Sequence, residues 1–372
     1  MLEQKSDLLH NRRVGVVSSP SGVLPDLTSS AEALLQVADV RALFGPEHGL
    51  LGAADAGEHV DASIHPSGVP IYSLYGDNLA PTAEQLADLD VIVFDTQDVG
   101  CRFYTYAWSL VLVMKAAAAA GVSVIVADRP NPIGGAVEGP GVQPAQRTLV
   151  GLHDVPIRHG LTIGELALLV NAELAIDCEL TVVRCEGWHR GSYWEATGLP
   201  WVAPSPNMPT VGTAVVYPGT CLMEGLSVSV GRSTAMPFEW QGAPWVDASA
   251  LANSLNALKL PGVRWRPVAF KPAAGPYANQ QCFGAQPHVL DRSKFRPVLS
   301  GFAMVTALWR MGQERSPEHD RIHWNTEHFD RLAGTPDIRI AIEAGATPAE
   351  LAADWPAYEQ QFRERAAPFL LY

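Results

Sequence analysis

The first half of the chain alternates short apolar runs with segments of helical periodicity. The apolar runs predict strands at residues 13–18, 40–44, 69–72, 91–95, 123–128 and 180–184. The segments between them predict helices at residues 31–38, 82–88, 108–120 and 162–174. Thr162 and Glu165 have the spacing of a capping box at the start of the last of these helices. Apolar strands in a strand–helix rhythm indicate a parallel sheet that has helices on both faces.

The pattern is weaker in the second half of the chain. Residues 201–232 are rich in proline and glycine, so we expect a long irregular segment there. Beyond it, the pattern predicts strands at 263–271 and 280–288, and helices at 301–311, 336–344 and 348–365. We therefore expect two domains that divide near residue 228.

Composition and charge exclude several classes of function. The formal net charge is −13 and no stretch of the chain is basic, which argues against nucleic acids and anionic membrane surfaces as partners. The longest apolar region, residues 107–127, contains Lys115 and Gly121 and is better explained by a buried helix and strand than by a membrane span. The N-terminus lacks the apolar core of a signal peptide, which predicts a cytoplasmic protein unless an export segment was removed.

Polar residues follow three of the predicted strands at their carboxyl ends. They are Glu47 in PEHG, Asp95, Gln97 and Asp98 in DTQD, and Arg129 and Asn131 in DRPNP. Because parallel sheets bind ligands beyond the carboxyl ends of their strands, these loops predict a cleft. The chain has no GxGxxG, GxxxxGK[ST] or GxSxG motif, so neither a nucleotide site nor a hydrolase serine is indicated.

Longer motifs carry a resemblance to a known family. They are FGPEHGLLGAADAGEHV, FDTQDVGCRFYTYAWSL, DRPNPIGG with EGP, GLPWVAPSPNMPT, YPGTCLMEG, PFEWQGAPW, FDRLAG and the final LLY. Through these motifs, the chain from Val14 to Tyr372 resembles the exo-β-N-acetylmuramidase family.

This resemblance implies a fold and an activity. The implied fold is α/β: a Rossmann-like, mostly parallel sheet flanked by helices in a catalytic domain over residues 1–228, and a smaller α+β domain over residues 229–372 that closes the cleft. The implied activity is exo-acting hydrolysis, which releases terminal β-linked N-acetylmuramic acid from the non-reducing end of peptidoglycan fragments. The partner would then be a small carbohydrate, and neither a metal nor an organic cofactor is implied.

The chain departs from the family's pattern in two places. It has SSPSG where the family usually has TNPTG, and EGLSVSVGRST where the family usually has EGTNxSEGRGT. An amide is thereby replaced by Ser227 and a carboxylate by Val230. These changes leave open a different glycan, or a relative that binds carbohydrate without hydrolysing it.

Glycoside hydrolysis usually needs two carboxyl groups. Glu47 is our candidate for the acid, Glu58 for the second carboxylate, and His48 for a residue that contacts the sugar or orients Glu47. In a substrate-assisted route the sugar's own acetamido group attacks, and Asp95, Gln97 or Asp98 would supply the stabilising polar group. The residues alone do not choose between these routes.

The binding candidates match the groups of an anionic sugar. Muramic acid carries a lactyl carboxylate, and an arginine fork such as that of Arg102, Arg129 or Arg232 can bind it in two places. The remaining candidates are Gln97, Asp98, Tyr104, Tyr106, Asn131, Asn207 and Glu224, through stacking and hydrogen bonds. For the arginines, an internal ion pair is the competing explanation, and for the asparagines a local turn. His319, His323 and His328 lie in EHDRIHWNTEH, which we interpret as a solvated segment and not as a metal site.

Overall fold

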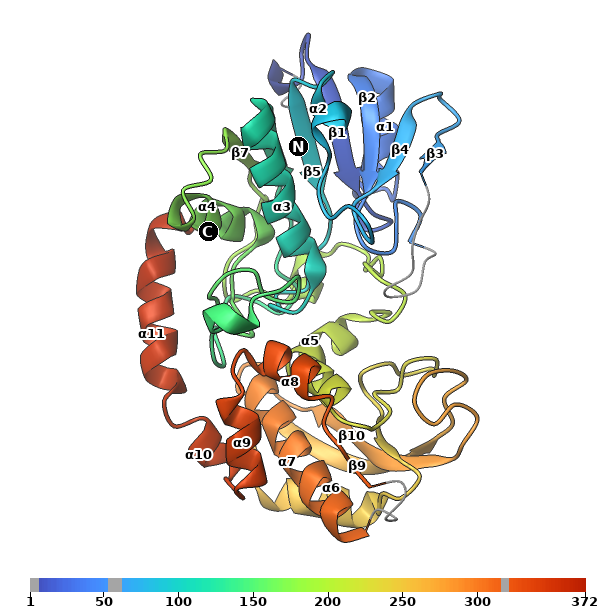
Figure 1. Cartoon of the computed structure of the whole chain (residues 1–372), viewed down its shortest axis with the longest axis vertical. Helices are drawn as coiled ribbons and strands as arrows, with labels where there is room; N and C mark the ends of the chain where they lie inside the picture. Colours follow the sequence, from blue (N-terminus) through green and yellow to red (C-terminus); the bar gives the residue numbers. More distant parts are fainter. Residues whose placement is uncertain (1–6, 53–61, 316–320) are drawn as a thin grey trace.

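The structure is a computed structural model that describes residues 7–52, 62–315 and 321–372. Figure 1 shows two units, an upper one built around a seven-stranded sheet and a lower one built around a three-stranded sheet. None of the helices in the described ranges is both long and apolar enough to cross a membrane.

The larger sheet confirms the expected parallel arrangement. Its strands are β1 (Arg13–Ser18), β2 (Asp39–Gly45), β3 (Ser63–Ile64), β4 (Pro70–Ser73), β5 (Val91–Asp95), β6 (Ser123–Ala127) and β7 (Leu180–Val183). Their order is β3-β4-β2-β1-β5-β6-β7, and only the short β3 pairs antiparallel. The chain runs outward from the centre in both directions, so the order reverses between β1 and β5. Such a reversal is where this type of sheet usually binds ligands.

Helices cover both faces of this sheet, as predicted. They are α1 (Ser30–Val37), α2 (Ala83–Leu86), α3 (Thr105–Ala120) and α4 (Ile163–Glu173). Helices α3 and α4 pack with Ile92 and Phe94 on one face, while α1 packs with Val91 and Val93 on the other. The predicted capping box is present at α4, where the Thr162 hydroxyl accepts from the Glu165 amide and the Glu165 carboxylate accepts from the Thr162 amide.

The smaller unit combines a sheet with helices. Its antiparallel sheet has the order β8-β10-β9, with β8 (Gln241–Ala243), β9 (Val263–Phe270) and β10 (Cys282–Val289). Its helices are α5 (Val211–Thr220), α6 (Ala248–Ala257), α7 (Pro297–Arg315), α8 (Thr326–Ala333) and α9 (Asp337–Glu343). The predicted strands at 263–271 and 280–288 and the predicted helices at 301–311 and 336–344 are therefore confirmed.

The prediction of an irregular segment over residues 201–232 is confirmed at both ends of the segment and wrong in its middle. Part of it forms α5 and the 3₁₀ turn Cys221–Gly225. The glycines here serve helix packing. A Cβ on Gly219 would lie 2.0 Å from the carbonyl oxygen of Pro297, and a Cβ on Gly301 of α7 would lie 2.3 Å from the carbonyl oxygen of Gly219. Glycine thus lets α5 and α7 touch backbone to backbone.

The last predicted helix, at residues 348–365, is in fact two helices. The first is α10 (Pro348–Leu351) and the second is α11 (Trp355–Ala366). Pro356 lies in the first turn of α11, where its missing N–H is tolerated, and it cannot continue a helix from the preceding turn.

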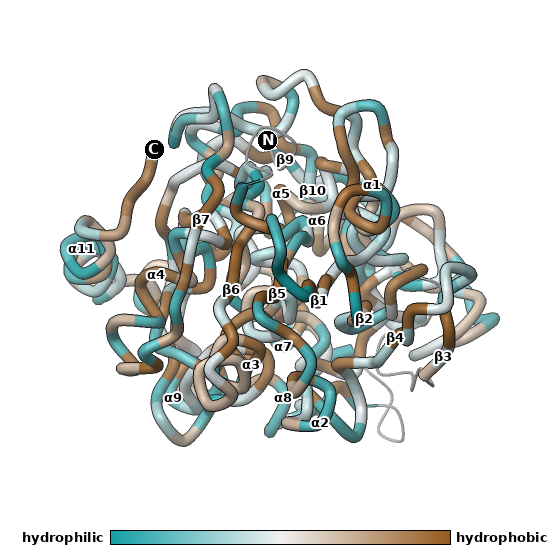
Figure 2. The backbone as a smooth tube through the Cα atoms, turned by 90° about the horizontal axis from the view of Figure 1, so that it is seen from above, coloured by the Kyte–Doolittle hydropathy of each residue, from teal (hydrophilic) through white to brown (hydrophobic). Residues whose placement is uncertain are grey.

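Helix α11 returns the chain to the larger unit. It runs beside both units in Figure 1, and Figure 2 places it and the C-terminal segment next to α4 and β7. Phe362 of α11 is buried with residues of α3 and α4. The domain boundary near residue 228 remains a proposal, and the packing of α5 against α7 favours a division before residue 211.

Candidate active site

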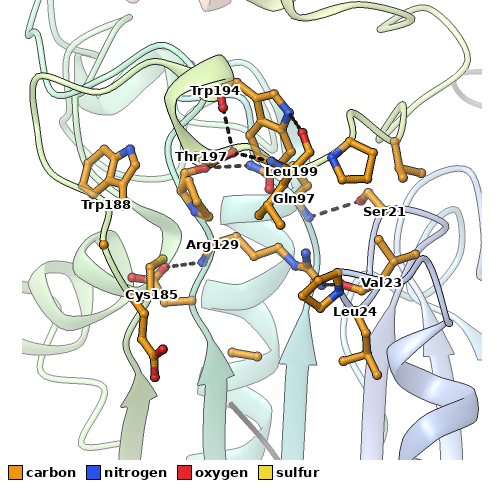
Figure 3. A pocket seen from close by; sticks show the side chains of 18 of the residues that line it. Ser21, Val23, Leu24, Gln97, Arg129, Cys185, Trp188, Trp194, Thr197 and Leu199 are labelled. Atoms are coloured by element: carbon orange, nitrogen blue, oxygen red, sulfur yellow. Dashed lines mark hydrogen bonds between the residues drawn. The ribbon is translucent and has the colours of Figure 1, made fainter.

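A pocket opens at the carboxyl ends of four neighbouring strands. It has a volume of about 520 Å³ and is lined by residues that follow β1, β5, β6 and β7, together with residues 192–202. Its size lies within the range of about 300–1,000 Å³ that is usual for small-molecule sites. Three predicted site residues, Asp95, Gln97 and Arg129, line this pocket, and Figure 3 shows the Arg129 side chain crossing it.

Asp95 and Arg129 form a bidentate ion pair in the pocket wall. Arg129 donates from Nε to Asp95 Oδ1 at 2.6 Å and from Nη2 to Asp95 Oδ2 at 3.0 Å. Nη2 also donates to the Val23 carbonyl oxygen at 2.9 Å. The arrangement gives no support to the predicted catalytic role of Asp95, because both of its oxygens are held by Arg129. Arg129 keeps Nη1 without a hydrogen-bond partner among the described residues.

Asp128, also in the pocket wall, was not among the predicted site residues. Its two oxygens accept from the Thr162 hydroxyl, the Gly164 amide, the Arg129 amide and the Tyr372 hydroxyl. Burial raises the pKa of Asp128 to about 6, although these hydrogen bonds act in the opposite direction. The Tyr372 hydroxyl also accepts from the Cys185 amide, so the C-terminal segment helps to hold β6 and β7 together.

Glu47 lies outside this pocket, in the turn after β2. It is half-buried, and its Oε2 accepts from the Thr105 hydroxyl at 2.7 Å. Burial, the charge of Glu47 and a hydrogen bond to Glu47 together raise the pKa of Tyr75, a neighbour that was not predicted. His48 is buried and has a φ of 73°, so it contributes to the left-handed turn that carries Glu47. Glu58 lies outside the described residues.

Glu47 and the pocket share one edge of the sheet. The Tyr106 hydroxyl lies 3.4 Å from the carbonyl oxygen of Glu47 and donates to the carbonyl oxygen of Pro204 at 2.6 Å. Val202, two residues before Pro204, lines the pocket. Two residues span at most about 7 Å, so a single short segment borders both places.

An aromatic layer leads from Glu47 to the smaller unit. Ring centroids lie 5.0 Å apart for Tyr106 and Tyr104, 6.2 Å for Tyr104 and Tyr217, and 4.8 Å for Tyr217 and Phe238. The Arg232 guanidinium lies 4.8 Å from the centre of the Phe238 ring, at the end of this layer. Tyr104 and Tyr106 are almost fully buried, so their rings are not exposed for stacking against a sugar. They serve the packing around the site instead.

Arg232 and Glu224 form a second ion pair, at 2.7 Å between Nε and Oε1. Burial opposes ionisation of Glu224, but the His328 hydrogen bond and the charge of Arg232 outweigh it and lower the Glu224 pKa. The two terminal nitrogens of Arg232 have no hydrogen-bond partner in the described part of the chain, and the side chain is one-third exposed. Arg232 can therefore offer a fork to a carboxylate.

The structure does not place Arg102 in the pocket. Its guanidinium is fully buried and donates to the carbonyl oxygens of Pro140, Val155 and Leu332 at 2.7–3.0 Å. Burial lowers the pKa of Arg102 to about 10. These bonds use the groups that a ligand carboxylate would need, so the predicted binding role is replaced by a structural one.

Asn131 and Asp98 also serve the fold. Asn131 donates to the Leu161 carbonyl and accepts from the Ile133 amide, which is the local turn considered as the alternative. Asp98 accepts from the Gly100 amide at 2.6 Å and lies 3.8 Å from His159, and burial raises its pKa to about 7. Asn207 is half-buried in the segment after Pro204. Among the described residues, no group of three or more His, Cys, Asp or Glu side chains has the arrangement of a metal site.

Two family models together match almost the whole chain. They are the N-terminal and C-terminal models of the exo-β-N-acetylmuramidase NamZ, over residues 14–212 and 215–372. The chain belongs to the NamZ family. A curated relative, the peptidoglycan β-N-acetylmuramidase NamZ of Bacillus subtilis, is 43% identical over 368 residues, which cover 98% of this chain and 88% of the relative.

Two crystal structures of DUF1343 family proteins from Bacteroides fragilis share the fold of this NamZ-family chain. The first has a TM-score of 0.91 at 34% identity, and the second a TM-score of 0.78 at 29% identity. Each match covers 100% of this chain and 97% of the crystal structure. The structural similarity thus extends over both units and over helix α11, which leads the chain back to the larger unit.

Proposed function

We propose that this protein is an exo-acting glycoside hydrolase that releases terminal β-linked N-acetylmuramic acid from the non-reducing end of peptidoglycan fragments. The observation that carries the proposal is the 43% identity to a peptidoglycan β-N-acetylmuramidase along nearly the full length of both chains. The pocket at the same edge of the sheet as Glu47 supports it, because an exo-acting enzyme needs a site that receives the terminal sugar.

Glu47 is the proposed general acid. The Thr105 hydroxyl and Tyr75 hold its carboxyl group in one orientation, which a proton donor to the glycosidic oxygen requires. Because Arg129 binds both carboxylate oxygens of Asp95, we propose that the second catalytic group is either Glu58 or the acetamido group of the substrate. The first would give a two-carboxylate mechanism and the second a substrate-assisted one.

Arg232 is the proposed partner of the lactyl carboxylate. Glu224 fixes its Nε, so the two free terminal nitrogens are oriented as a fork. Arg129 has only one nitrogen to offer and already compensates Asp95. Of the three arginines named from the sequence, Arg232 therefore suits a planar carboxylate best.

Of the two departures from the family's pattern, SSPSG places Ser21 in the pocket wall, whereas Ser227 and Val230 of the second do not line the pocket. Val230 is buried in the apolar core of the smaller unit, and the Ser227 hydroxyl accepts from the His323 amide at 3.0 Å. These contacts are structural, so they give no reason to prefer a protein that binds carbohydrate without hydrolysing it.

The proposal is tested by incubating the purified protein with a 4-nitrophenyl β-glycoside of N-acetylmuramic acid, with the Bacillus subtilis relative as positive control. We expect nitrophenol release well above the blank. Tight muropeptide binding without release would overturn the proposal and favour the non-hydrolytic alternative.

A further inference from the structure

Two buried polar atoms in the pocket wall have no hydrogen-bond partner among the residues that the structure describes. They are the indole Nε1 of Trp188, a donor, and the amide Oε1 of Gln97, an acceptor. Their residues are 6% and 2% exposed. A buried polar atom left without a partner costs about 1–3 kcal/mol, so it points to a group that arrives from outside. Figure 3 shows the two side chains on different walls of the pocket.

The buried carboxylates of the wall are already used, and Arg129 keeps only Nη1 without a partner in the described part of the chain. Asp95 has both oxygens on Arg129, and Asp128 has four donors. The Gln97 side-chain nitrogen donates to the carbonyl oxygens of Asp98 and Pro130, which fixes the amide so that Oε1 is left over. Much of the remaining wall is apolar, from Val23, Leu24 and Leu199 among others. The two fully buried unpaired atoms thus suit a ligand that brings one acceptor, one donor and an apolar group.

We propose that the pocket binds the 2-acetamido group of a sugar, with Trp188 donating to the amide carbonyl and Gln97 accepting from the amide N–H. An acetamido group has one acceptor, one donor and a methyl group, which matches the wall. This inference rests on the proposed function, since it takes a peptidoglycan fragment as the ligand. Both sugars of such a fragment, N-acetylmuramic acid and N-acetylglucosamine, carry this group.

The test measures binding of monosaccharides by titration calorimetry. Trp188→Phe removes the N–H and keeps a ring against Tyr372, whose centroid lies 5.2 Å away. Trp265→Phe is the matched control, because Trp265 Nε1 is also buried without a partner but lies on β9 in the smaller unit. We expect Trp188→Phe to weaken binding of both acetamido sugars about three- to tenfold and to leave glucose binding unchanged. Trp265→Phe should match the wild type for all three sugars.

A measurement on the unmodified protein guards against a variant that fails to fold. In a spectrum of the indole ¹⁵N–¹H groups, the Trp188 resonance should shift on addition of N-acetylglucosamine and stay in place with glucose. A Trp188 resonance that stays in place with both acetamido sugars would overturn the assignment.

Other outcomes overturn the inference. Equal affinity of the wild type for glucose and N-acetylglucosamine, or unchanged binding by Trp188→Phe, would mean that an internal water satisfies these atoms. Because binding does not depend on turnover, selective acetamido binding without hydrolysis would refute the proposed activity alone. Hydrolysis without this selectivity would refute the pocket assignment alone.

Discussion

Glu47 is the side chain on which the proposed chemistry depends. Glu47→Gln keeps an oxygen for the Thr105 hydroxyl but removes the acidic proton. We expect turnover of the nitrophenyl substrate to fall by about 10²–10⁴-fold while the melting temperature stays near that of the wild type. Glu195→Gln, which alters an exposed glutamate paired with Arg292, is the control and should retain full activity. A Glu47→Gln protein with more than a tenth of the activity would remove Glu47 from this role.

Asp98 should make stability depend on pH. Its folded-state pKa of about 7 lies above the ordinary value of about 3.9, because the carboxyl group is buried. The folded chain therefore holds a proton that the unfolded chain has released, and its stability falls as the pH rises from about 4 to 7. Asp98→Asn should thus gain stability over the wild type, on the order of 2 kcal/mol at pH 8, with no such gain at pH 4.

Urea unfolding at these two pH values measures the difference. Glu138→Gln should behave in the same direction, since burial raises the pKa of Glu138 to about 7 as well. A difference between Asp98→Asn and the wild type that does not change with pH would refute the linkage.

At the scale of single residues, the sequence indicates which loops carry the candidate site residues. It does not indicate which of their atoms remain without a hydrogen-bond partner in the folded chain. Asp95, Gln97 and Arg129 were correctly expected at the strand ends. The carboxylate of Asp95 is bound by Arg129, which lies 34 residues further along the chain. The structural role of Arg102 depends on the carbonyl oxygen of Leu332, which lies 230 residues away. Trp188 lies in none of the quoted motifs, and the final LLY does not reveal that Tyr372 donates to Asp128 in the pocket wall.

At the scale of elements, two capping boxes allow a matched comparison. Thr162 caps α4 in a buried position and its hydroxyl also donates to Asp128 at 2.7 Å, whereas Thr347 caps α10 on the surface. Thr347→Ala should cost about 1 kcal/mol of unfolding free energy. Thr162→Ala should cost about 2–3 kcal/mol, because it also removes a donor from a buried carboxylate. Equal losses in chemical denaturation would show that the bond to Asp128 contributes nothing.

The elements differ in how well their sequences predict them. Strands β1, β5 and β6 are buried on both faces, so they are continuous apolar runs that are easily recognised. Helix α5 was missed because its glycines and Pro218 resemble those of a loop. The need for glycine there comes from α7, which lies far along the chain.

At the scale of the whole molecule, Arg102 joins the two units. One of its three acceptors, Leu332, belongs to α8 of the smaller unit, and the others belong to the larger. Arg102→Met removes the donors and leaves buried carbonyls unpaired, so we expect a loss of about 3 kcal/mol or more in unfolding free energy. Arg315→Met, at an exposed ion pair with Asp247, should lose less than about 1 kcal/mol. Similar losses for both variants in chemical denaturation would contradict the joining role.

The return of α11 also limits how the two units can move. The chain crosses from the larger unit to the smaller one before α5 and crosses back through α10 and α11, so two separate covalent connections join them (Figure 1). A body attached to another at two points can turn only about the line through those points. Any opening motion of this protein should therefore follow a single hinge axis, which makes one well-placed pair of spectroscopic labels sufficient to follow it.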